Sequence, residues 1–336
     1  MPKNELNVLV TAASRRVALI RGFQAALGKL DLRGKVVTTD INPLSPGLYF
    51  SDNHYRAPLT TDPGYLERLH QICEAENIGV IIPTIDDELE IMGEVREEFA
   101  QAGVEIIISP PRTSRICNDK IETYRFFSKR GLPTPRTWLP GELPDHGELE
   151  FPLFLKPRRG RGSVHVYQIR NRGELEFFIE YVEDPIVQQF LEGREYTLDT
   201  FVDRDGDVVA VVPRRRLWVR SGVMDKGRTE NRNELIDLGV QVAKELRIVG
   251  PANIQVKYTD GKPMVFEVNP RFSGGIPLTL AAGVDFTVLA LRMVLGEKLE
   301  PRLGDFTDGL VMMSYEESIF RMIDTNGYAD ILKLIT

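Results

Sequence analysis

Short apolar runs alternate with helical patterns over the first third of the chain. Segment 17–27, for example, repeats its apolar residues at the spacing of a helix that buries one face. We expect the apolar runs themselves to be strands, because they are short and end at turn-forming residues. Strand–helix alternation predicts a parallel sheet with helices on both faces, and therefore an α/β fold. The expected strands are 7–11, 35–40, 78–83 and 104–109.

The rest of the chain is divided by prolines and contains strands joined by hairpins. Pro110 and Pro111 mark a linker, and the helix expected after it ends at Gly131. A basic, glycine-rich loop at 158–163 separates two short strands, which makes it a hairpin tip. Asp260-Gly261 is the turn signal of a second hairpin. The expected strands here are 150–157, 164–169, 185–191, 213–220, 252–257 and 264–269.

Composition and charge exclude several classes of function. With 336 residues, 42% hydrophobic and 27% charged, the chain suits a globular protein of two or three lobes. Its net charge of −7 argues against general nucleic-acid binding, which needs a basic surface. No apolar run approaches the length that spans a bilayer, and the first ten residues lack the apolar core of a signal peptide. We therefore expect a cytoplasmic protein that does not bind membranes.

Two further cofactor classes are disfavoured. Cys73 and Cys117 fit neither a disulfide framework nor a zinc spacing, and the four histidines are scattered. The turn at 11–16, after the first expected strand, lacks the spaced glycines of a dinucleotide-binding fingerprint. A structural metal and a nicotinamide or flavin cofactor are therefore not expected.

The segment 264–275 carries the clearest candidate chemistry. Glu267 and Asn269 lie two residues apart on an expected strand, so their side chains share one face. The neighbouring strand of the hairpin would bring Gln255 close to Glu267. These oxygen donors suit Mg²⁺ bridging nucleotide phosphates, and Arg271 could neutralise a transferring phosphoryl group. The alternative is a surface hairpin whose polar face is solvated.

Two other segments suggest phosphate and base contacts. Lys156 ends a strand just before the basic loop, where Gly160, Gly162 and Ser163 would let backbone amides approach phosphate oxygens. The apolar strand 185–191 leads to Glu195, which could accept hydrogen bonds from ribose hydroxyls. A solvated hairpin tip and an ordinary core hairpin are the alternatives for these two segments.

The order of these motifs resembles the ATP-grasp superfamily. The resemblance is carried by Asp119-Lys120, Lys156-Pro with the basic loop, the run 187–195, Gln255, and Glu267-Val-Asn-Pro-Arg271. More closely, the chain resembles one half of a carbamoyl-phosphate synthase large subunit and stand-alone carboxylate–amine ligases. The resemblance implies a Rossmann-like lobe (1–112), a small lid lobe with a linker (113–185) and a C-terminal lobe (186–336), with ATP between the last two.

The resemblance also implies roles for individual residues. Lys120 and Lys156 would contact the nucleotide phosphates, and Arg271 would stabilise the transferring γ-phosphoryl group. Glu195 would hold the ribose. Mg²⁺, with Mn²⁺ as an alternative, would bind Gln255, Glu267 and Asn269. The lid loop would include Arg158, Gly160, Gly162 and Ser163, and the adenine hinge would be Gln188, Gln189, Phe190 and Leu191.

The reaction implied by the resemblance proceeds in two steps. A substrate carboxylate takes the γ-phosphoryl group of ATP, and an amine then displaces phosphate to leave an amide. The partners would be a small carboxylic acid and an amine, and a homodimer is the default oligomer. Two alternatives stay open. One is a carbamoyl-phosphate synthase-like protein that phosphorylates bicarbonate or carbamate with partner chains, and the other is a non-catalytic ATP-binding module.

One basic strand falls outside the shared motifs. Alternation over 213–220 predicts that Arg214, Arg216, Trp218 and Arg220 share one face, forming an anion-binding wall. We expect Arg220 to bind the substrate carboxylate. A solvated edge strand is the alternative, above all for the first two arginines.

Overall fold

The computed structural model describes residues 5–144, 149–160, 162, 164–220 and 222–322. The chain divides into two compact units. The first unit consists of the chain up to Ile108, Thr287–Lys298 and the segment from Ser314 onward; the second consists of Ser109–Phe286 and Leu299–Met313. The three-lobe division expected from the sequence stays a prediction. Among the described residues, no helix has both the length and the apolarity needed to cross a bilayer.

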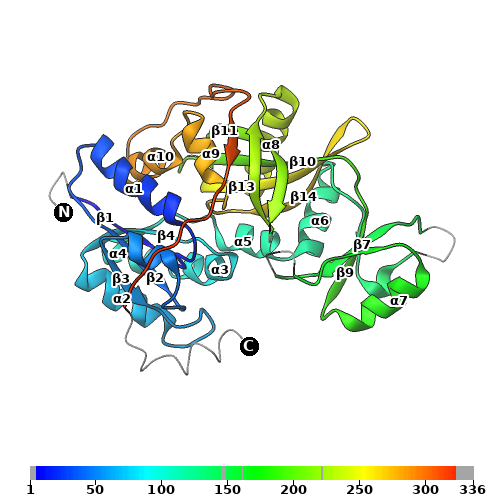
Figure 1. Cartoon of the computed structure of the whole chain (residues 1–336), viewed down its shortest axis with the longest axis horizontal. Helices are drawn as coiled ribbons and strands as arrows, with labels where there is room; N and C mark the ends of the chain where they lie inside the picture. Colours follow the sequence, from blue (N-terminus) through cyan, green and yellow to red (C-terminus); the bar gives the residue numbers. More distant parts are fainter. Residues whose placement is uncertain (1–4, 145–148, 161, 163, 221, 323–336) are drawn as a thin grey trace. The chain divides into compact units, whose positions relative to one another are not determined.

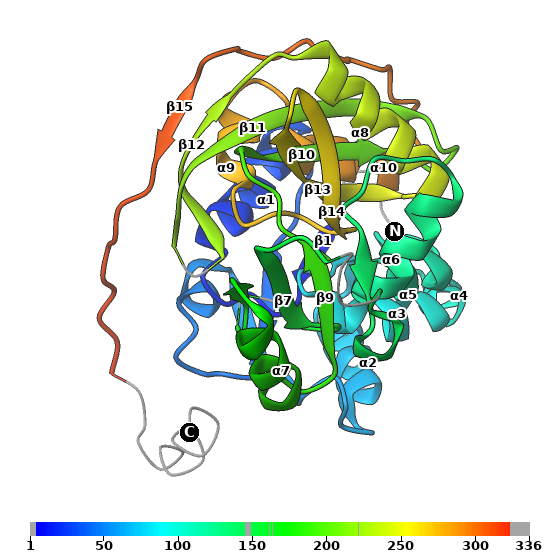
Figure 2. The same ribbon diagram turned by 90° about the vertical axis from the view of Figure 1, so that its right-hand side faces the viewer.

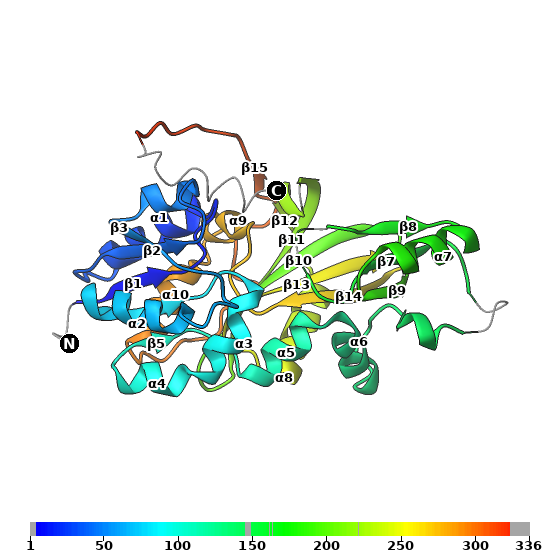
Figure 3. The same ribbon diagram turned by 90° about the horizontal axis from the view of Figure 1, so that it is seen from below.

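The first unit contains the predicted parallel sheet. Its strand order is β3-β2-β1-β4-β5, and all four neighbouring pairs are parallel. Figure 3 shows α1 on one face of this sheet and α2 and α4 on the other. The α/β prediction is therefore confirmed. The strands are β1 (Asn7–Val10), β2 (Val36–Asp40), β3 (Asn53–Arg56), β4 (Ile78–Ile82) and β5 (Glu105–Ile106). The helices are α1 (Val17–Lys29), η1 (Pro46–Phe50), α2 (Tyr65–Ala75), α3 (Asp86–Glu94) and α4 (Arg96–Gln101), with most of α10 (Phe286–Val294).

The second unit contains two antiparallel sheets. The smaller has the order β6-β9-β7-β8 and carries α7 (Arg172–Tyr181), whose first turn is capped by the Asn171 side chain. Strand β7 pairs antiparallel with β8, so the basic loop between them is a hairpin connection, as predicted. Figure 1 shows α7 beside β7 and β9. The strands of this sheet are β6 (Thr137–Trp138), β7 (Leu153–Pro157), β8 (Tyr167–Ile169) and β9 (Pro185–Gln189), and η2 (Pro140–Glu142) follows β6.

The larger sheet has the order β14-β13-β10-β11-β12-β15, which Figure 2 shows as a curved layer. Apolar residues of α5, α6 and α8 form a core with β10, β13 and β14. The β13–β14 turn has Asp260 and Gly261 at φ values of 50° and 76°, as an Asp-Gly hairpin turn requires. The strands are β10 (Arg194–Val202), β11 (Val208–Arg220), β12 (Val223–Thr229), β13 (Gly250–Thr259), β14 (Lys262–Asn269) and β15 (Val311–Met313). The helices are α5 (Pro111–Asn118), α6 (Lys120–Lys129), α8 (Asn233–Leu246) and α9 (Ile276–Ala281).

A buried ion pair fixes the turn that follows β14. Arg214 donates from Nε and Nη2 to the two carboxylate oxygens of Asp199, each at 2.7 Å, and both side chains are 1% exposed. Arg214 Nη2 also donates to Ser273 Oγ at 3.0 Å, and Thr279 Oγ1 donates to Asp199 Oδ2 at 2.5 Å. Strands β10 and β11 are therefore bonded to the turn and to α9 through charged groups.

Gly275 is required by this arrangement. A Cβ atom at this position would lie 2.3 Å from Arg214 Nη1 and 3.0 Å from the terminal methyl of Met224. The guanidinium cannot move aside without losing its bonds to Asp199. Gly275 is therefore needed because a side chain would clash with Arg214. Its backbone conformation does not require glycine, since a φ of −96° is open to any residue.

We expect Gly275→Ala to lower the free energy of unfolding by about 1–3 kcal/mol, because the added methyl overpacks a locked buried group. The matched control is Gly141→Ala, where the added Cβ meets nothing within 4 Å and the change should stay within about 0.5 kcal/mol. Urea titration of both variants measures the difference. Equal stabilities would show that Arg214 is free to move.

Candidate functional site

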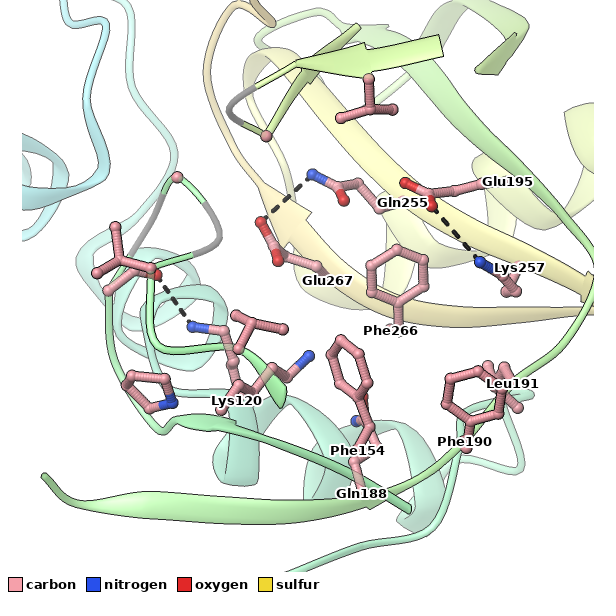
Figure 4. Close-up of a pocket in the computed structure, with 18 of the residues that line it drawn as sticks. Lys120, Phe154, Gln188, Phe190, Leu191, Glu195, Gln255, Lys257, Phe266 and Glu267 are labelled. Carbon is pink, nitrogen blue, oxygen red and sulfur yellow. Dashed lines mark hydrogen bonds and ion pairs between the residues drawn. The ribbon is translucent and has the colours of Figure 1, made fainter. Parts of the chain in front are cut away.

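A pocket opens in the second unit, between the small sheet and the large one (Figure 4). Phe154 projects into it from β7, and Phe266 and Glu267 project into it from β14. Most residues predicted from the sequence line its wall. These are Lys120, Lys156, Gly160, Gly162, Gln188, Gln189, Phe190, Leu191, Glu195, Gln255 and Glu267.

Four of the predicted residues that the structure describes do not line this pocket. Asn269 and Arg271 extend a chain of hydrogen bonds from Glu267, Arg158 pairs with Asp119, and Arg220 pairs with Asp225. Ser163 lies outside the described residues.

Aromatic side chains form one part of the wall, and the sequence reasoning missed two of them. Phe154 lies 6.4 Å from Phe190 between ring centroids. Phe154 is two residues before Lys156 on β7, so strand alternation could have placed both in the pocket. Phe266 is adjacent to Glu267, and alternation predicts opposite faces for such neighbours. A register shift that leaves Phe266 without a partner on β13 removes this constraint.

Lys156 is the buried cation of the site. Its side chain is 4% exposed, and Nζ lies 5.8 Å from the Phe154 ring and 5.6 Å from the Phe266 ring. Burial, helped by the nearby charge of Lys120, lowers the pKa of Lys156 to about 8, although Glu267 and Glu195 act in the opposite direction. The ammonium is thus charged at neutral pH but held at a cost that a bound anion would relieve.

The start of α6 holds the basic loop against the pocket. The Asp119 carboxylate caps the helix by accepting from the amides of Ile121 and Glu122, and it pairs with Arg158 Nη2 at 2.6 Å. Burial alone would raise the pKa of Asp119, but Arg158 and the helix amides lower it overall. Lys120 Nζ donates to the carbonyl oxygen of Gly160 at 3.0 Å. Arg158 therefore fixes the base of the loop, while Arg159 lines the pocket.

Glu267 is the centre of a chain of polar contacts. Gln255 lies directly opposite Glu267 across the β13–β14 pair and donates from Nε2 to Glu267 Oε1 at 3.3 Å. Asn269 Nδ2 donates to the same oxygen at 2.9 Å, and Arg271 Nη2 donates to Asn269 Oδ1 at 3.2 Å. The structure therefore brings together the residues that the sequence placed on one face.

This donor set fits a magnesium ion that also binds a ligand's phosphates. Mg²⁺ usually takes one or two protein carboxylates and completes its shell with waters and phosphate oxygens. Glu267 would supply the carboxylate. The amides of Gln255 and Asn269 would supply neutral oxygens after rotation, which gives up the contacts of these oxygens with Arg216 and Arg271. Within the described residues no group of three or more acidic, histidine or cysteine side chains could hold a metal alone.

Glu195 contacts two cations that the sequence reasoning did not assign to this site. Arg216 Nη1 lies 2.9 Å from Oε1, and Lys257 Nζ lies 3.6 Å from Oε2. Figure 4 shows Glu195 and Lys257 together on the same wall. Lys257 follows Gln255 by two residues, so the strand pattern contained the signal for it.

The predicted common face of the basic strand is wrong. Two register shifts between β11 and β12, on either side of Trp218, interrupt the alternation. Arg214 is buried against Asp199 and Arg216 lines the pocket, whereas Trp218 is 64% exposed. The Arg220 side chain is 53% exposed and pairs with Asp225 at 3.3 Å. The four residues therefore do not form a common anion-binding wall, and the role of Arg220 stays a prediction.

Comparison with known proteins finds family models that match two segments of the chain. A family model described as "ATP-grasp in the biosynthetic pathway with Ter operon" matches residues 181–317, and one described as "PylC-like, N-terminal domain" matches residues 8–107. The chain contains an ATP-grasp domain. The matched segment includes Glu195, Gln255, Glu267, Asn269 and Arg271.

The chain is also similar to a curated protein over most of its length. It is 24% identical over 310 residues to the carbamoyl phosphate synthase arginine-specific large chain of Geobacillus stearothermophilus, a match that covers 86% of this chain. The match covers 29% of that relative's length. The resemblance to part of a carbamoyl-phosphate synthase large subunit is therefore confirmed.

Two solved structures are similar in fold to most of this chain. The L-amino acid ligase of Bacillus licheniformis has a TM-score of 0.69 at 20% identity, covering 86% of this chain and 74% of that chain. The biotin carboxylase domain dimer of Hydrogenobacter thermophilus 2-oxoglutarate carboxylase, solved with MgADP, ADP and bicarbonate, has a TM-score of 0.71 at 19% identity. That match covers 90% of this chain and 73% of that chain.

We expect Lys156 to titrate near pH 8, well below the ordinary lysine value of about 10.4, because its ammonium is desolvated. A phosphate-bearing ligand binds the charged form, so its affinity should be highest below pH 8 and fall as the pH rises through that value. The acetylation rate of Lys156, followed by mass spectrometry against pH, measures the titration, and Lys156→Met identifies the labelled peptide. A midpoint at the ordinary value would contradict this prediction.

Proposed function

We propose that this protein is an ATP-dependent ligase that joins a small carboxylic acid to an amine and releases ADP and phosphate. The observation that carries the proposal is the pocket of the second unit. Aromatic side chains, the lysines Lys120 and Lys156, and the polar pair Gln255 and Glu267 all line this one pocket. Aromatic rings suit a purine, and lysines suit phosphates. Glu267, with its hydrogen-bonded neighbours Gln255 and Asn269, suits the magnesium ion that accompanies a nucleoside triphosphate.

Each part of the pocket receives one part of the nucleotide in this proposal. The base lies among Phe154, Phe190 and Phe266 and bonds to the backbone of 188–191. Lys120, Lys156 and the glycines of the basic loop bind the phosphates. Glu267 and Asn269, with Gln255, would hold magnesium, which would neutralise charge on the phosphates. Closure of the basic loop keeps water away from the reactive intermediate.

The chemistry then needs positioning rather than a protein nucleophile. An oxygen of the substrate carboxylate attacks the γ-phosphorus, and the bond from that phosphorus to the β–γ bridging oxygen breaks, giving ADP and an acyl phosphate. The amine nitrogen attacks the acyl carbon, phosphate leaves, and the nitrogen loses a proton to give the amide. Arg271 stabilises the charge on the transferring group, and Arg220 binds the acid. The B. licheniformis relative, named as an L-amino acid ligase, supports this reaction class.

A second candidate reaction is phosphorylation of bicarbonate or carbamate. It is favoured by the G. stearothermophilus relative, which is named as a carbamoyl phosphate synthase chain, and it would require partner chains. A non-catalytic ATP-binding module is the third reading. ADP release measured with a panel of acids and amines, and separately with bicarbonate and ammonia, distinguishes the three. Like the dimeric H. thermophilus domain, the protein would act on small molecules as a homodimer in the cytoplasm.

We expect Glu267→Gln and Asn269→Ala each to reduce ADP formation at least about a hundredfold while the thermal unfolding midpoint stays close to that of the wild type. The reason is that Glu267→Gln removes the negative charge of the metal-binding carboxylate, and Asn269→Ala removes an amide oxygen ligand. Glu176→Gln, on the exposed face of α7, is the control. Unchanged turnover of the Glu267 or Asn269 variant at saturating Mg²⁺ would contradict the metal assignment.

The two remaining arginines should separate binding from catalysis. We expect Arg220→Lys to raise the KM for the acid by about ten- to a hundredfold, because lysine keeps the charge but loses the planar fork. Arg271→Lys should instead lower kcat, because its contact strengthens only as charge develops on the γ-phosphate. Steady-state kinetics on both variants measure the split. If Arg220→Lys left the KM for every productive acid unchanged, Arg220 would not bind the substrate and would be a solvated surface residue.

A further inference from the structure

The Glu195 carboxylate is held by one cation on each of its oxygens. Oε1 faces Arg216 Nη1 at 2.9 Å, and Oε2 faces Lys257 Nζ at 3.6 Å. The contact with Lys257 follows from the register, because Glu195 and Lys257 lie directly opposite each other on β10 and β13. The carboxylate is 27% exposed and lines the pocket, so a ligand can reach it.

Arg216 is itself immobilised by its other contacts. Its Nη1 also donates to Gln255 Oε1 at 3.3 Å, and its Nη2 donates to the carbonyl oxygen of Gly222 at 2.7 Å. The side chain is only 6% exposed. The guanidinium therefore bonds to three different strands or turns, and it cannot rotate without breaking at least one of these contacts.

The Nε–H of Arg216 has no partner among the described residues and is out of contact with solvent. Folded proteins rarely leave a buried donor unpaired, and such groups call for an explanation beyond stability. Nη1 and Nη2 bond to Glu195, Gln255 and Gly222. The geometry that makes these three contacts leaves Nε–H without an acceptor.

The acceptor capacity left on Glu195 indicates what it binds. A carboxylate has about four lone-pair sites. Arg216, at 2.9 Å, occupies one on Oε1, and Lys257, at an ion-pair distance of 3.6 Å from Oε2, leaves at least one free there. One acceptor site therefore remains on each oxygen, side by side, which matches two neighbouring hydroxyl groups. A phosphate would instead be repelled by the carboxylate, and the charge of Arg216 is already compensated by Glu195.

We propose that Arg216 and Lys257 are positioning residues that fix the Glu195 carboxylate to accept hydrogen bonds from the two vicinal hydroxyls of a nucleotide ribose, so that they set the preference for ribose over deoxyribose. This inference rests on the proposed function, because it requires an adenine nucleotide in the pocket. Arg216 acts through Glu195 and does not touch the reacting atoms. Its loss affects recognition of the sugar and leaves the contribution of the phosphates in place.

Calorimetric titration with MgADP, Mg-2′-deoxyADP and Mg-3′-deoxyADP tests the proposal. The wild-type protein should bind MgADP about tenfold or more tightly than either deoxynucleotide, because a missing hydroxyl leaves an acceptor of a charged group unpaired. Glu195→Gln should remove most of this preference. In Arg216→Gln the ratio of the deoxynucleotide Kd to the MgADP Kd should fall to about threefold or less, because only MgADP binds more weakly. In Arg216→Lys this ratio should lie between those of the wild type and Arg216→Gln, since lysine cannot make all three contacts.

The control is Arg215→Gln, which changes the neighbouring residue of the same strand and removes a contact with Glu230 outside the pocket. Its ratio should equal that of the wild type. Lys257→Met tests the second cation. Because the Lys257 side chain is 26% exposed, this variant should fold even if the Arg216 variants do not. This variant should also lower the ratio.

Three results would overturn the inference. One is a wild-type protein that binds ribose and deoxyribose nucleotides equally. Another is an Arg216→Gln variant that weakens MgADP and both deoxynucleotides by the same factor, which would make Arg216 a phosphate contact or a structural residue. The third is an unchanged ratio in Lys257→Met. Failure of the wild type to bind any of the three nucleotides would instead defeat the proposed function, and the ribose inference with it.

Discussion

The buried ion pair between Asp199 and Arg214 is the constraint on which the larger sheet and its functional turn depend. Both side chains are 1% exposed, so neither charge is solvated by water. Removing one partner of such a pair typically costs about 3–5 kcal/mol, because the other charge stays buried without compensation. The pair is completed by Ser273 and Thr279, which belong to the segment after β14. A polar interior thereby determines where that segment lies.

The consequence for the site is that the turn carrying Arg271 is fixed on both sides of this residue. On one side it bonds to Asn269 and through it to Glu267. On the other side Ser273 is bonded to the buried arginine, and Gly275 allows the close approach. A residue that must meet charge developing on a transferring group gains from such pre-organisation, because the orientation is fixed during folding and not during reaction. The stability of the sheet and the geometry of the candidate site therefore rest on the same contacts.

Local periodicity was sufficient to predict the parallel sheet, the hairpins and the grouping of Glu267 with Gln255 and Asn269. These features follow from the two-residue repeat of a strand and from turn residues, which the sequence displays directly. The register shifts on β11 and β14 carry no comparable signal, so Phe266 was missed and the common face of Arg214, Trp218 and Arg220 was wrong. The partner of Arg214 could not be predicted either, because burial of a charge depends on a contact between separate strands.

Charge distribution links the pocket to the chemistry proposed for it. The protein carries a net charge of −7, yet its pocket wall gathers the cations of Lys120, Lys156, Arg159, Arg216 and Lys257 around the two carboxylates of Glu195 and Glu267. Two of these cations compensate Glu195, which leaves an excess of positive charge beside the aromatic rings. Burial has already removed much of the water that would stabilise Lys156. A polyanionic ligand restores that lost stabilisation, so part of the free energy of its binding is stored in the folded protein before the ligand arrives.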